Sequence, residues 1–418
     1  MKISKLIGRE IYDSRGLPTV ECELVLEDGS YVRASVPSGL SRGTQEAFEM
    51  RDGGDRLMGK GVQHAIENIE NVIAPVLIAQ TPDVVAMDMA LIELDGTPER
   101  SKLGGNAMIA VSMAVLRAQA MISDMEPYEL IAYLCDYSSV TLPIPLFNFI
   151  GGGVHAENNL RIQEFIVIPV GTQSFRLCME SAVSFFNYFK TYLKKKGLEI
   201  VYGEEGGLAC NFKDDHQALD FLHEAMQKVT KASGQQFMIA LDVAASQFYN
   251  QKKKTYHWGN KHYTTDQLIE FYQGLIKDYP IFAIEDGLSE WDIDGWVAMT
   301  AELGDKIQVV GDDVFVSSPS RIARAIELGA ATATIIKPNQ VGTVTECLQA
   351  IKLCREHDMS VIVSHCSGET DDTFIVDLAV GTSSGYIKAG GVTRGERIAK
   401  YNELLRIEDV LMLSLLGS

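Results

Sequence analysis

The sequence predicts an α/β fold in which a small α+β domain precedes an eight-stranded β/α barrel. Two observations support this prediction. Strand-like segments followed by helical ones fill the chain to about residue 135, and short apolar runs then alternate with helical patterns. Apolar strands that alternate with helices are typical of a mostly parallel sheet covered by helices. We therefore predict domains over 1–135 and 140–418, joined by the proline-bearing segment 138–146.

Residues 19–36 alternate apolar and polar side chains around Asp28-Gly29, which predicts a β-hairpin. Beyond it, apolar residues recur at helical spacing over 62–76, and residues 103–122 read as a second, largely buried helix. Strands followed by helices make the N-terminal part a small α+β domain. The residues expected to share one face of the hairpin are Val20, Cys22, Leu24 and Leu26.

Six segments of the second part share one form, an apolar run that leads into polar residues. Their end points lie 43, 27, 25, 28 and 23 residues apart, so each gap has room for a helix. With residues 163–170 and the segment near residue 201, they are enough to close an eight-stranded barrel. The carboxyl ends of barrel strands converge on one mouth, where catalytic residues gather. The six end points are Asp242, Glu285, Asp312, Lys337, His365 and Lys388.

Three carboxylates end three successive strands, at Asp242, Glu285 and Asp312. Brought together they would repel one another unless a cation lay among them. Oxygen ligands without a nearby cysteine or histidine favour Mg²⁺. The alternative is that each acid caps the helix after its strand. Three such acids in succession, followed by Lys337, favour the metal.

Two further positions suggest proton transfer. Lys337 lies beside the predicted metal, where nearby cations and partial burial are expected to lower its pKa and make it a general base; the alternative is a cation that anchors the substrate. Glu204 and Glu205 precede a Gly-Gly turn. Beside a barrel mouth, one of them is expected to have a raised pKa and to donate a proton. Adjacent acids are also common on solvated surfaces.

Two glycine-rich loops are candidates for ligand contact. Residues 151–159 carry His155, and their glycines would let the backbone approach a ligand closely. Residues 36–52 lead into a predicted helix, with Gly39 and Gly43 as hinges of a lid. An ordinary loop is the alternative in both cases.

Composition narrows the class of protein. The formal net charge of −19 disfavours nucleic acids and other polyanions as partners, but allows a local pocket for a small anion. The 7 cysteines include no C-x-x-C pair, which is typical of free thiols in a reducing compartment. Because the chain has no apolar signal core and no run of about 18 apolar residues, we expect a cytoplasmic protein without a membrane span.

The chain resembles the enolase family over nearly its whole length. The motifs that carry the resemblance include REIYDSRGLPTVE, HAENNLRIQEF, GEEGG, VVGDD, IIKPNQVGTVTE and SHCSGETDDTF. The resemblance implies a modified (TIM-like) β/α barrel after the α+β domain. It also implies a hydro-lyase of glycolysis and gluconeogenesis that interconverts 2-phosphoglycerate and phosphoenolpyruvate, with two Mg²⁺ per active site. A homodimer or an assembly of dimers is the implied oligomer.

The resemblance also assigns roles to residues. Asp242, Glu285 and Asp312 match the ligands of the first Mg²⁺. Ser41 of the lid matches a ligand of the second. Lys337 matches the base that removes the proton beside the substrate carboxylate, and Glu205 matches the acid that helps to expel hydroxide. The substrate and proton-network positions are His155, Gln163, Glu164, His365, Ser367 and Lys388.

One departure from the family pattern concerns the substrate. Where the family has Ser-His-Arg-Ser-Gly, with an arginine that grips the substrate phosphate, this chain has Cys366. The thiol has three interpretations: a neutral group in a site whose phosphate grip lies elsewhere, a mark of a smaller or less charged substrate group, or a redox-sensitive thiol of lowered pKa. Arg42, which replaces a lid threonine, is the candidate for a relocated grip.

Two other functions stay open at this point. One is an enolase paralogue that acts on a different phosphorylated or phosphonate-bearing 2-hydroxy or enol acid. The other is a weakly catalytic protein of the same fold that is kept for binding, for example at a cell surface. The complete set of Lys337, Glu205 and three metal acids argues against the second.

Overall fold

The computed structural model describes residues 1–39 and 43–416. An antiparallel sheet opens the chain, in the order β1 (Ile3–Tyr12), β2 (Pro18–Leu26) and β3 (Tyr31–Ser35). The predicted hairpin is thus formed by β2 and β3, and its four apolar residues are fully buried beneath a long helix. The helices of this domain are η1 (Arg56–Gly59), α1 (Gln63–Asn68), η2 (Ile69–Ile73), α2 (Ala74–Leu77), α3 (Val84–Asp95), α4 (Gly105–Ile122) and α5 (Pro127–Leu134).

The helix predicted over 62–76 is broken into α1, η2 and α2. The turn of η2 is wider than an α-helical turn and ends two residues before Pro75, which has no N–H to donate back into a helix. Val76, expected on the apolar face, is exposed. The break therefore shifts the last turn away from the face that Ile66, Ile69 and Ile73 share.

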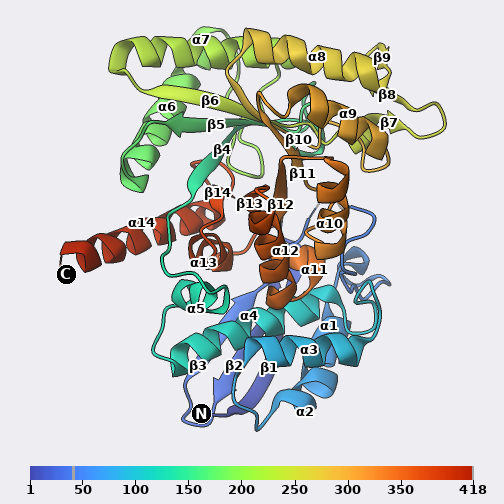
Figure 1. The fold of residues 1–418 in the computed structure, drawn as a ribbon, viewed down its shortest axis with the longest axis vertical. Coiled ribbons are helices and arrows are strands. Elements are labelled where there is room, and N and C mark those ends of the chain that lie inside the picture. The colour runs from blue at the N-terminus through green and yellow to red at the C-terminus, as the bar shows by residue number, and fades with distance from the viewer. Residues whose placement is uncertain (40–42, 417–418) are drawn as a thin grey trace.

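Helix α4 lies at the centre of the molecule. It packs on β2 and β3 and, on its other side, against α11 (Pro338–Val341) and α12 (Val344–Glu356) of the barrel (Figure 1). Within the described part of the chain it is the one helix long and apolar enough to cross a membrane, and 78% of that stretch is buried inside the protein. Its apolar surface is therefore accounted for by contacts within this fold.

The second part is a closed eight-stranded barrel, as predicted. Strand β5 runs antiparallel to both of its neighbours, and the other neighbouring pairs are parallel. In the order in which they pair, the strands are β10 (Ile281–Glu285), β11 (Gln308–Gly311), β12 (Ala333–Ile336), β13 (Ser360–Ser364), β14 (Gly385–Lys388), β4 (Ile144–Gly151), β5 (Glu164–Val170) and β6 (Gln236–Asp242).

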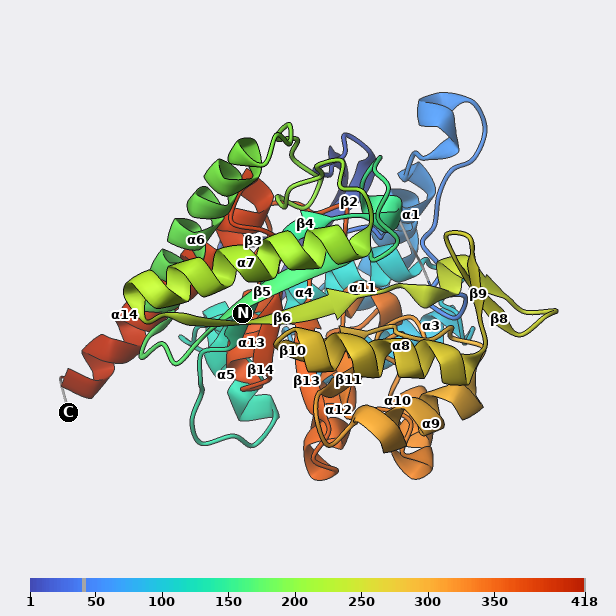
Figure 2. The same cartoon turned by 90° about the horizontal axis from the view of Figure 1, so that it is seen from above.

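Helices cover the outside of the barrel. Helix α6 packs on β5 and α7 on β6 (Figure 2), while a small sheet of β7 (Tyr249–Asn250), β8 (Thr255–Trp258) and β9 (Lys261–Tyr263) extends beside α8. Besides α11 and α12, the helices and short helical turns of the barrel domain are η3 (Gly153–His155), α6 (Phe175–Lys195), α7 (Asp215–Ser233), η4 (Ala245–Phe248), α8 (Thr265–Asp278), α9 (Ile293–Leu303), α10 (Pro319–Leu328), α13 (Phe374–Gly381) and α14 (Gly395–Leu416).

One barrel strand was predicted wrongly. The segment near residue 201 is not a barrel strand, since Tyr202 forms only an isolated bridge with Leu208. The strand that closes the barrel is β4, which begins inside the segment predicted as a linker. Its prolines stand at the start of the strand, where a missing N–H costs little pairing. The residues that follow, 145–151, are buried.

The inside of the barrel is a packed apolar plug, not a channel. Small and branched side chains from seven of the strands meet there and form a floor beneath the polar mouth. They are Leu146, Ile166, Ile168, Ala240, Ala283, Val310, Ala333, Ile335 and Ile362.

Candidate active site

The strand ends predicted to carry chemistry meet at one mouth of the barrel. Asp242 and Glu285 are the last residues of β6 and β10 and lie opposite each other in register. Asp312 and Lys337 directly follow β11 and β12, and Lys388 ends β14. Asp242, Asp312, Lys337 and Lys388 line one cavity. Parallel register alone therefore brings these side chains together.

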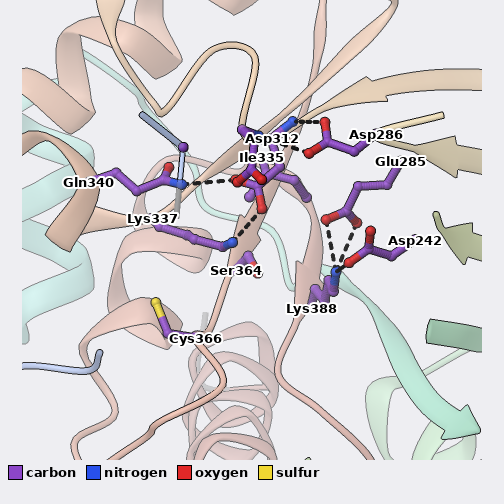
Figure 3. Close-up of polar contacts among 12 residues, drawn as sticks. Asp242, Glu285, Asp286, Asp312, Ile335, Lys337, Gln340, Ser364, Cys366 and Lys388 are labelled. Carbon is purple, nitrogen blue, oxygen red and sulfur yellow. Dashed lines mark hydrogen bonds and ion pairs between the residues drawn. The ribbon is translucent and has the colours of Figure 1, made fainter. Parts of the chain in front are cut away.

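Lys388 lies at the centre of the acidic side of this cavity and is 3% exposed. Its Nζ donates to both carboxylate oxygens of Glu285, at 2.9 Å each, and to Oδ2 of Asp242 at 3.2 Å (Figure 3). Oε1 of Glu164 lies 3.3 Å from the same nitrogen. One ammonium group thus faces three buried carboxyl groups.

Asp312 has partners of its own. Its carboxylate accepts hydrogen bonds from Lys337 Nζ and, at 3.0 Å, from Gln340 Nε2 (Figure 3). The turn that carries it is held by Asp286, whose two oxygens accept from the backbone N–H groups of Asp312 (2.9 Å) and Asp313 (3.0 Å). Sequence reasoning assigned no role to Asp286, although its place beside Glu285 at a strand end was a signal.

The carboxyl groups of the cavity outnumber its cations. Among the described lining residues, 5 acids face 2 lysines. Burial, with Asp242 close by, raises the pKa of Glu285 to about 8. Burial and neighbouring acids likewise raise the pKa of Asp286 and of Asp313 well above their usual values. This excess of buried carboxyl groups, several of which hold protons only because they are crowded and buried, fits a site for a divalent cation.

The donor set suits a hard metal ion. Asp286, Asp312 and Asp313 have ligand oxygens within 4.8 Å of one another, and so do the ligand atoms of His155, Glu164 and Glu205. The predicted ligands Asp242 and Glu285 bond to Lys388 in this structure, and Asp312 bonds to Lys337. The residues fit a cation such as Mg²⁺ in the kind of atom they offer, since all three acids present oxygen.

The ion pair with Asp312 decides the pKa of Lys337 in this structure, whereas the lowered pKa was predicted for a site that holds metal. Burial lowers the pKa of Lys337, but the carboxylate of Asp312 at its ammonium group outweighs burial and holds that pKa well above its usual value. The same ion pair lowers the pKa of Asp312 despite its burial. Lys337 is therefore protonated in this arrangement.

Glu164 and Glu205 form a second cluster with His155. His155 Nδ1 lies 3.4 Å from Glu205 Oε1 and 3.6 Å from Glu164 Oε1, and Asn148 Nδ2 donates to Glu205 Oε2 at 3.0 Å. Burial opposes ionisation of Glu205, but His155 and His365 outweigh it and lower the pKa of Glu205 well below the usual value. The prediction of a raised pKa there is wrong.

Glu164 is the protonated member of this pair. Burial raises the pKa of Glu164 well above its usual value, and the charge of Glu205 raises it further. Three buried atoms of the cluster have no hydrogen-bond partner: His155 Nδ1, Glu164 Oε2 and Asn148 Oδ1. Atoms of this kind are suited to a bound polar ligand. Asn148 was missed by sequence reasoning, although a lone polar residue inside the run LFNFI was a signal.

His365, Cys366 and Ser367 line the cavity from the loop after β13. His365 Nε2 lies 3.9 Å from Glu205 Oε2, and burial holds the pKa of His365 well below its usual value. The thiol of Cys366 donates to Asn339 Oδ1 at 3.2 Å. Burial raises the pKa of Cys366 to about 12, because it outweighs the effect of Lys337. The redox interpretation needs a lowered pKa, and this arrangement does not favour it.

The remaining predicted positions divide into two groups. Gln163 lines the cavity and donates from Nε2 to Asp242 Oδ2 at 3.0 Å. Ser41 and Arg42 lie outside the described residues. On either side of them, Gly39 and Glu46 line the cavity, and Glu46 Oε1 accepts from Gln340 Nε2 at 3.2 Å. Glu46 was not predicted as a site residue.

Two family models match the chain. The N-terminal domain of enolase matches residues 3–131, and the C-terminal TIM barrel domain of enolase matches residues 139–414. Together the two matches cover nearly all of the sequence, including every described residue of the cavity.

Proposed function

Because this chain belongs to the enolase family, we propose that it is a Mg²⁺-dependent hydro-lyase that interconverts 2-phosphoglycerate and phosphoenolpyruvate. One observation carries the proposal. A single buried cavity holds a lysine at a strand end, a set of carboxylates beside it, and a second pair of carboxyl groups that shares a proton. Those are the groups needed to remove a proton next to a carboxylate and to expel a hydroxyl group.

Asp242, Glu285 and Asp312 would hold the first Mg²⁺, and Ser41 would contribute to the second. Bound Mg²⁺ would supply the positive charge that a substrate carboxylate needs while its neighbouring proton leaves. The proposal is supported by the excess of buried acids over lysines among the described lining residues.

Lys337 is the proposed base. It follows β12 directly, so the rigid barrel holds its backbone in place. Its proton is retained here because Asp312 stabilises the ammonium form. Any cation that engages Asp312 removes that stabilisation, and the pKa of Lys337 then falls toward the range of a working base.

Glu164 and Glu205 are the proposed proton donors to the leaving hydroxyl group. Within the pair the proton lies on Glu164, whose pKa is raised by burial, while Glu205 is held ionised by His155 and His365. Asn148 and His155 fix the position of Glu205. While Glu164 holds that proton the pair carries one charge. Handing the proton over leaves both carboxyl groups ionised, with the ammonium group of Lys388 3.3 Å from Glu164 to balance the new charge.

The test is to separate the two proton steps. Purified protein with Mg²⁺ and 2-phosphoglycerate is expected to form an enol product that absorbs in the ultraviolet. In deuterated water, Lys337→Ala is expected to stop exchange of the substrate α-proton, whereas Glu205→Gln should retain part of that exchange and lose formation of the product. Equal loss of exchange in both variants would contradict the separate roles. Mg²⁺ binding without turnover would favour a different substrate, and neither binding nor turnover would favour a binding protein.

One observation favours a second candidate substrate, an acid with a smaller or less charged group in place of the phosphate. Among the described lining residues the only lysines are Lys337 and Lys388, both engaged by carboxylates, and no arginine lines the cavity. The wall at Cys366 is a neutral thiol bonded to Asn339. A different phosphorylated or phosphonate-bearing acid would require a cation from Arg42, outside the described residues.

Cys366→Arg tests the two candidates, with Cys366→Ser as the matched neutral control. If the phosphate grip is simply missing, the arginine should raise kcat/KM for 2-phosphoglycerate by about tenfold or more, as expected for one charge-assisted hydrogen bond. If Arg42 supplies the grip, the arginine should have little effect and Arg42→Thr alone should cripple the enzyme. Preference of the parent protein for a 2,3-dihydroxy acid without phosphate would identify the second candidate.

The family resemblance alone suggests three further properties: a role in glycolysis and gluconeogenesis, a cytoplasmic location, and a homodimer or an assembly of dimers. Sedimentation of the purified protein tests the oligomeric state, with a monomer at micromolar concentration as the contradictory result.

A further inference from the structure

The loop over 365–373 joins β13 to α13 and has no regular secondary structure, yet its residues 365–370 are all buried. Three of them, His365, Cys366 and Ser367, line the cavity. A buried irregular segment must find partners for its backbone polar groups outside a helix or sheet. Its geometry is therefore set by whatever surrounds it.

Helix α14 holds one side of this loop. Arg397 and Lys400 are both fully buried. Arg397 donates to the carbonyl oxygens of Cys366 and Ser367 and contacts His365 Nδ1. Lys400 Nζ donates to the carbonyl oxygen of Thr370 and to Glu369 Oε2, both at 2.6 Å.

The N-terminal domain holds the other side. Ser38 and Gly368 exchange two backbone hydrogen bonds, at 2.8 and 2.9 Å. The N–H of Ser14 donates to the carbonyl oxygen of Glu369 at 2.7 Å. Ser14 and Ser38 of the N-terminal domain, more than three hundred residues away in sequence, thus pair with the backbone of the loop.

The strongest contact between the two lies at the end of the loop. Both terminal nitrogens of Arg117, on α4, donate to the carboxylate of Asp372 at 2.7 Å each. The same carboxylate accepts from the backbone N–H of Ser35 at 2.9 Å and of Phe374 at 2.8 Å. Arg117 also donates to the carbonyl oxygen of Arg33 at 2.6 Å. One ion pair therefore joins α4, β3, the loop and the start of α13.

We propose that Arg117 and Asp372 are positioning residues, through which the N-terminal domain keeps the loop in the geometry that catalysis needs. The inference rests on the proposed function, since it assigns the pair an effect on that reaction. Neither residue lines the cavity. Through the loop, the pair would fix the positions of His365, which faces Glu205, and of Cys366 and Ser367 in the cavity wall.

This placement predicts which step suffers. Asp242 and Glu285 end β6 and β10, and Asp312 and Lys337 directly follow β11 and β12, so the barrel strands hold their backbone. Loosening the loop should therefore leave Mg²⁺ binding and α-proton exchange nearly intact. Substrate affinity and loss of the hydroxyl group should fall, because His365 and the loop wall move; a displacement of about 1 Å can cost about a hundredfold in rate.

The chain offers a matched control. Arg100 also joins the N-terminal domain to the barrel, through an ion pair with Glu346 of α12 at 2.6 Å. The side chains of this pair are 12% and 18% exposed, against 16% and 9% for Arg117 and Asp372. The Arg100 pair does not touch the loop over 365–373. Arg100→Ala and Arg117→Ala should therefore lower the melting temperature to a similar extent and differ only in catalysis.

The experiment compares both alanine variants with Asp372→Asn, Arg117→Lys and the double variant Arg117→Ala/Asp372→Asn. Arg117→Ala is expected to lower kcat/KM for water loss by about tenfold or more and α-proton exchange by less than about threefold. Arg100→Ala should lower neither by more than about threefold. The double variant should have about the same kcat/KM for water loss as Arg117→Ala, because the two residues act as one pair. Arg117→Lys should restore part of the activity.

Hydrogen exchange of the loop amides separates failure of this inference from failure of the proposed function. Faster exchange over 365–373 in Arg117→Ala but not in Arg100→Ala supports the positioning role even if 2-phosphoglycerate is not a substrate. Unchanged exchange in the loop overturns the inference. Equal losses of α-proton exchange and water loss in Arg117→Ala, or the same losses in Arg100→Ala, also overturn it.

Discussion

The cavity has two walls that are built differently. The strand wall consists of Asp242, Asp312, Lys337 and Lys388, with Glu285 bonded to Lys388, whereas the loop wall consists of His365, Cys366 and Ser367. Barrel register places the strand wall, and each of its charges lies against an opposite charge. The loop wall is held by contacts from α14 and from the N-terminal domain.

Single substitutions should therefore have different effects in the two walls. In the strand wall, each side chain carries a charge whose loss leaves buried partners uncompensated. In the loop wall, many contacts share the task, so most single ones should contribute little. The strand wall therefore depends on individual charges, and the loop wall depends on many contacts together.

The largest effect is expected from Asp312→Asn. The change removes a charge from the strand wall and leaves Lys337 without its anionic partner. Mg²⁺ binding should weaken and kcat should fall by about a thousandfold, the scale of losing one main electrostatic group of a site. Calorimetry with Mg²⁺ and a turnover assay check this, with circular dichroism to show that the fold survives. If the variant bound Mg²⁺ normally and turned over at the parent rate, Asp312 would not be a metal ligand.

Lys388→Met should destabilise the metal-free protein. Without the ammonium group, the carboxyl groups of Glu285, Asp242 and Glu164 lose their shared partner, which costs about 3–5 kcal/mol of unfolding free energy for a buried pair. Urea unfolding with a chelator measures the loss, and millimolar Mg²⁺ should reduce it. Lys352→Met, at an exposed lysine, is the control. Equal stability of the two variants would show that the strand wall does not depend on Lys388.

Mg²⁺ affinity should depend on pH. The pKa of Glu285 is raised to about 8, so below that pH the metal must displace a proton, and its affinity should rise with pH and level off above about 8. The steepest slope is about tenfold per pH unit for one proton. Titration calorimetry in buffers of different ionisation enthalpy counts the protons released. Constant affinity from pH 6.5 to pH 8 would contradict the raised pKa.

The smallest effect is expected from Ser14→Ala. The hydroxyl accepts one hydrogen bond, from the N–H of Glu369 at 3.2 Å, and its loss should cost about 1 kcal/mol or less because other contacts hold the loop. Turnover should change by less than about threefold. Melting curves and kcat/KM measure both. A tenfold loss of kcat/KM would show that the loop wall depends on this one contact and that its support is not shared among many.

Local sequence patterns predicted the fold class and the residue types of the strand wall. Asp242, Glu285, Lys337 and Lys388 could be found because a buried parallel strand is a local pattern of apolar residues, and its last residue is visible in the sequence. His155 and the pair Glu204–Glu205 were candidates from their glycine-rich segments, and the family resemblance selected Glu205 and added Glu164. Whether these residues hold metal and substrate stays a prediction.

The charge states of the site and the contacts that support the loop follow from the folded chain and were not visible in local patterns. The pKa of Lys337 is raised because Asp312, 25 residues away in sequence, lies against it, and Glu164 rather than Glu205 is protonated because two histidines from other segments stabilise the charge on Glu205. β4 closes the barrel although its prolines indicated a linker. Arg117 and Asp372 meet across 255 residues. Local patterns carry no information about such pairings, because burial and long-range contacts exist only once the chain has folded.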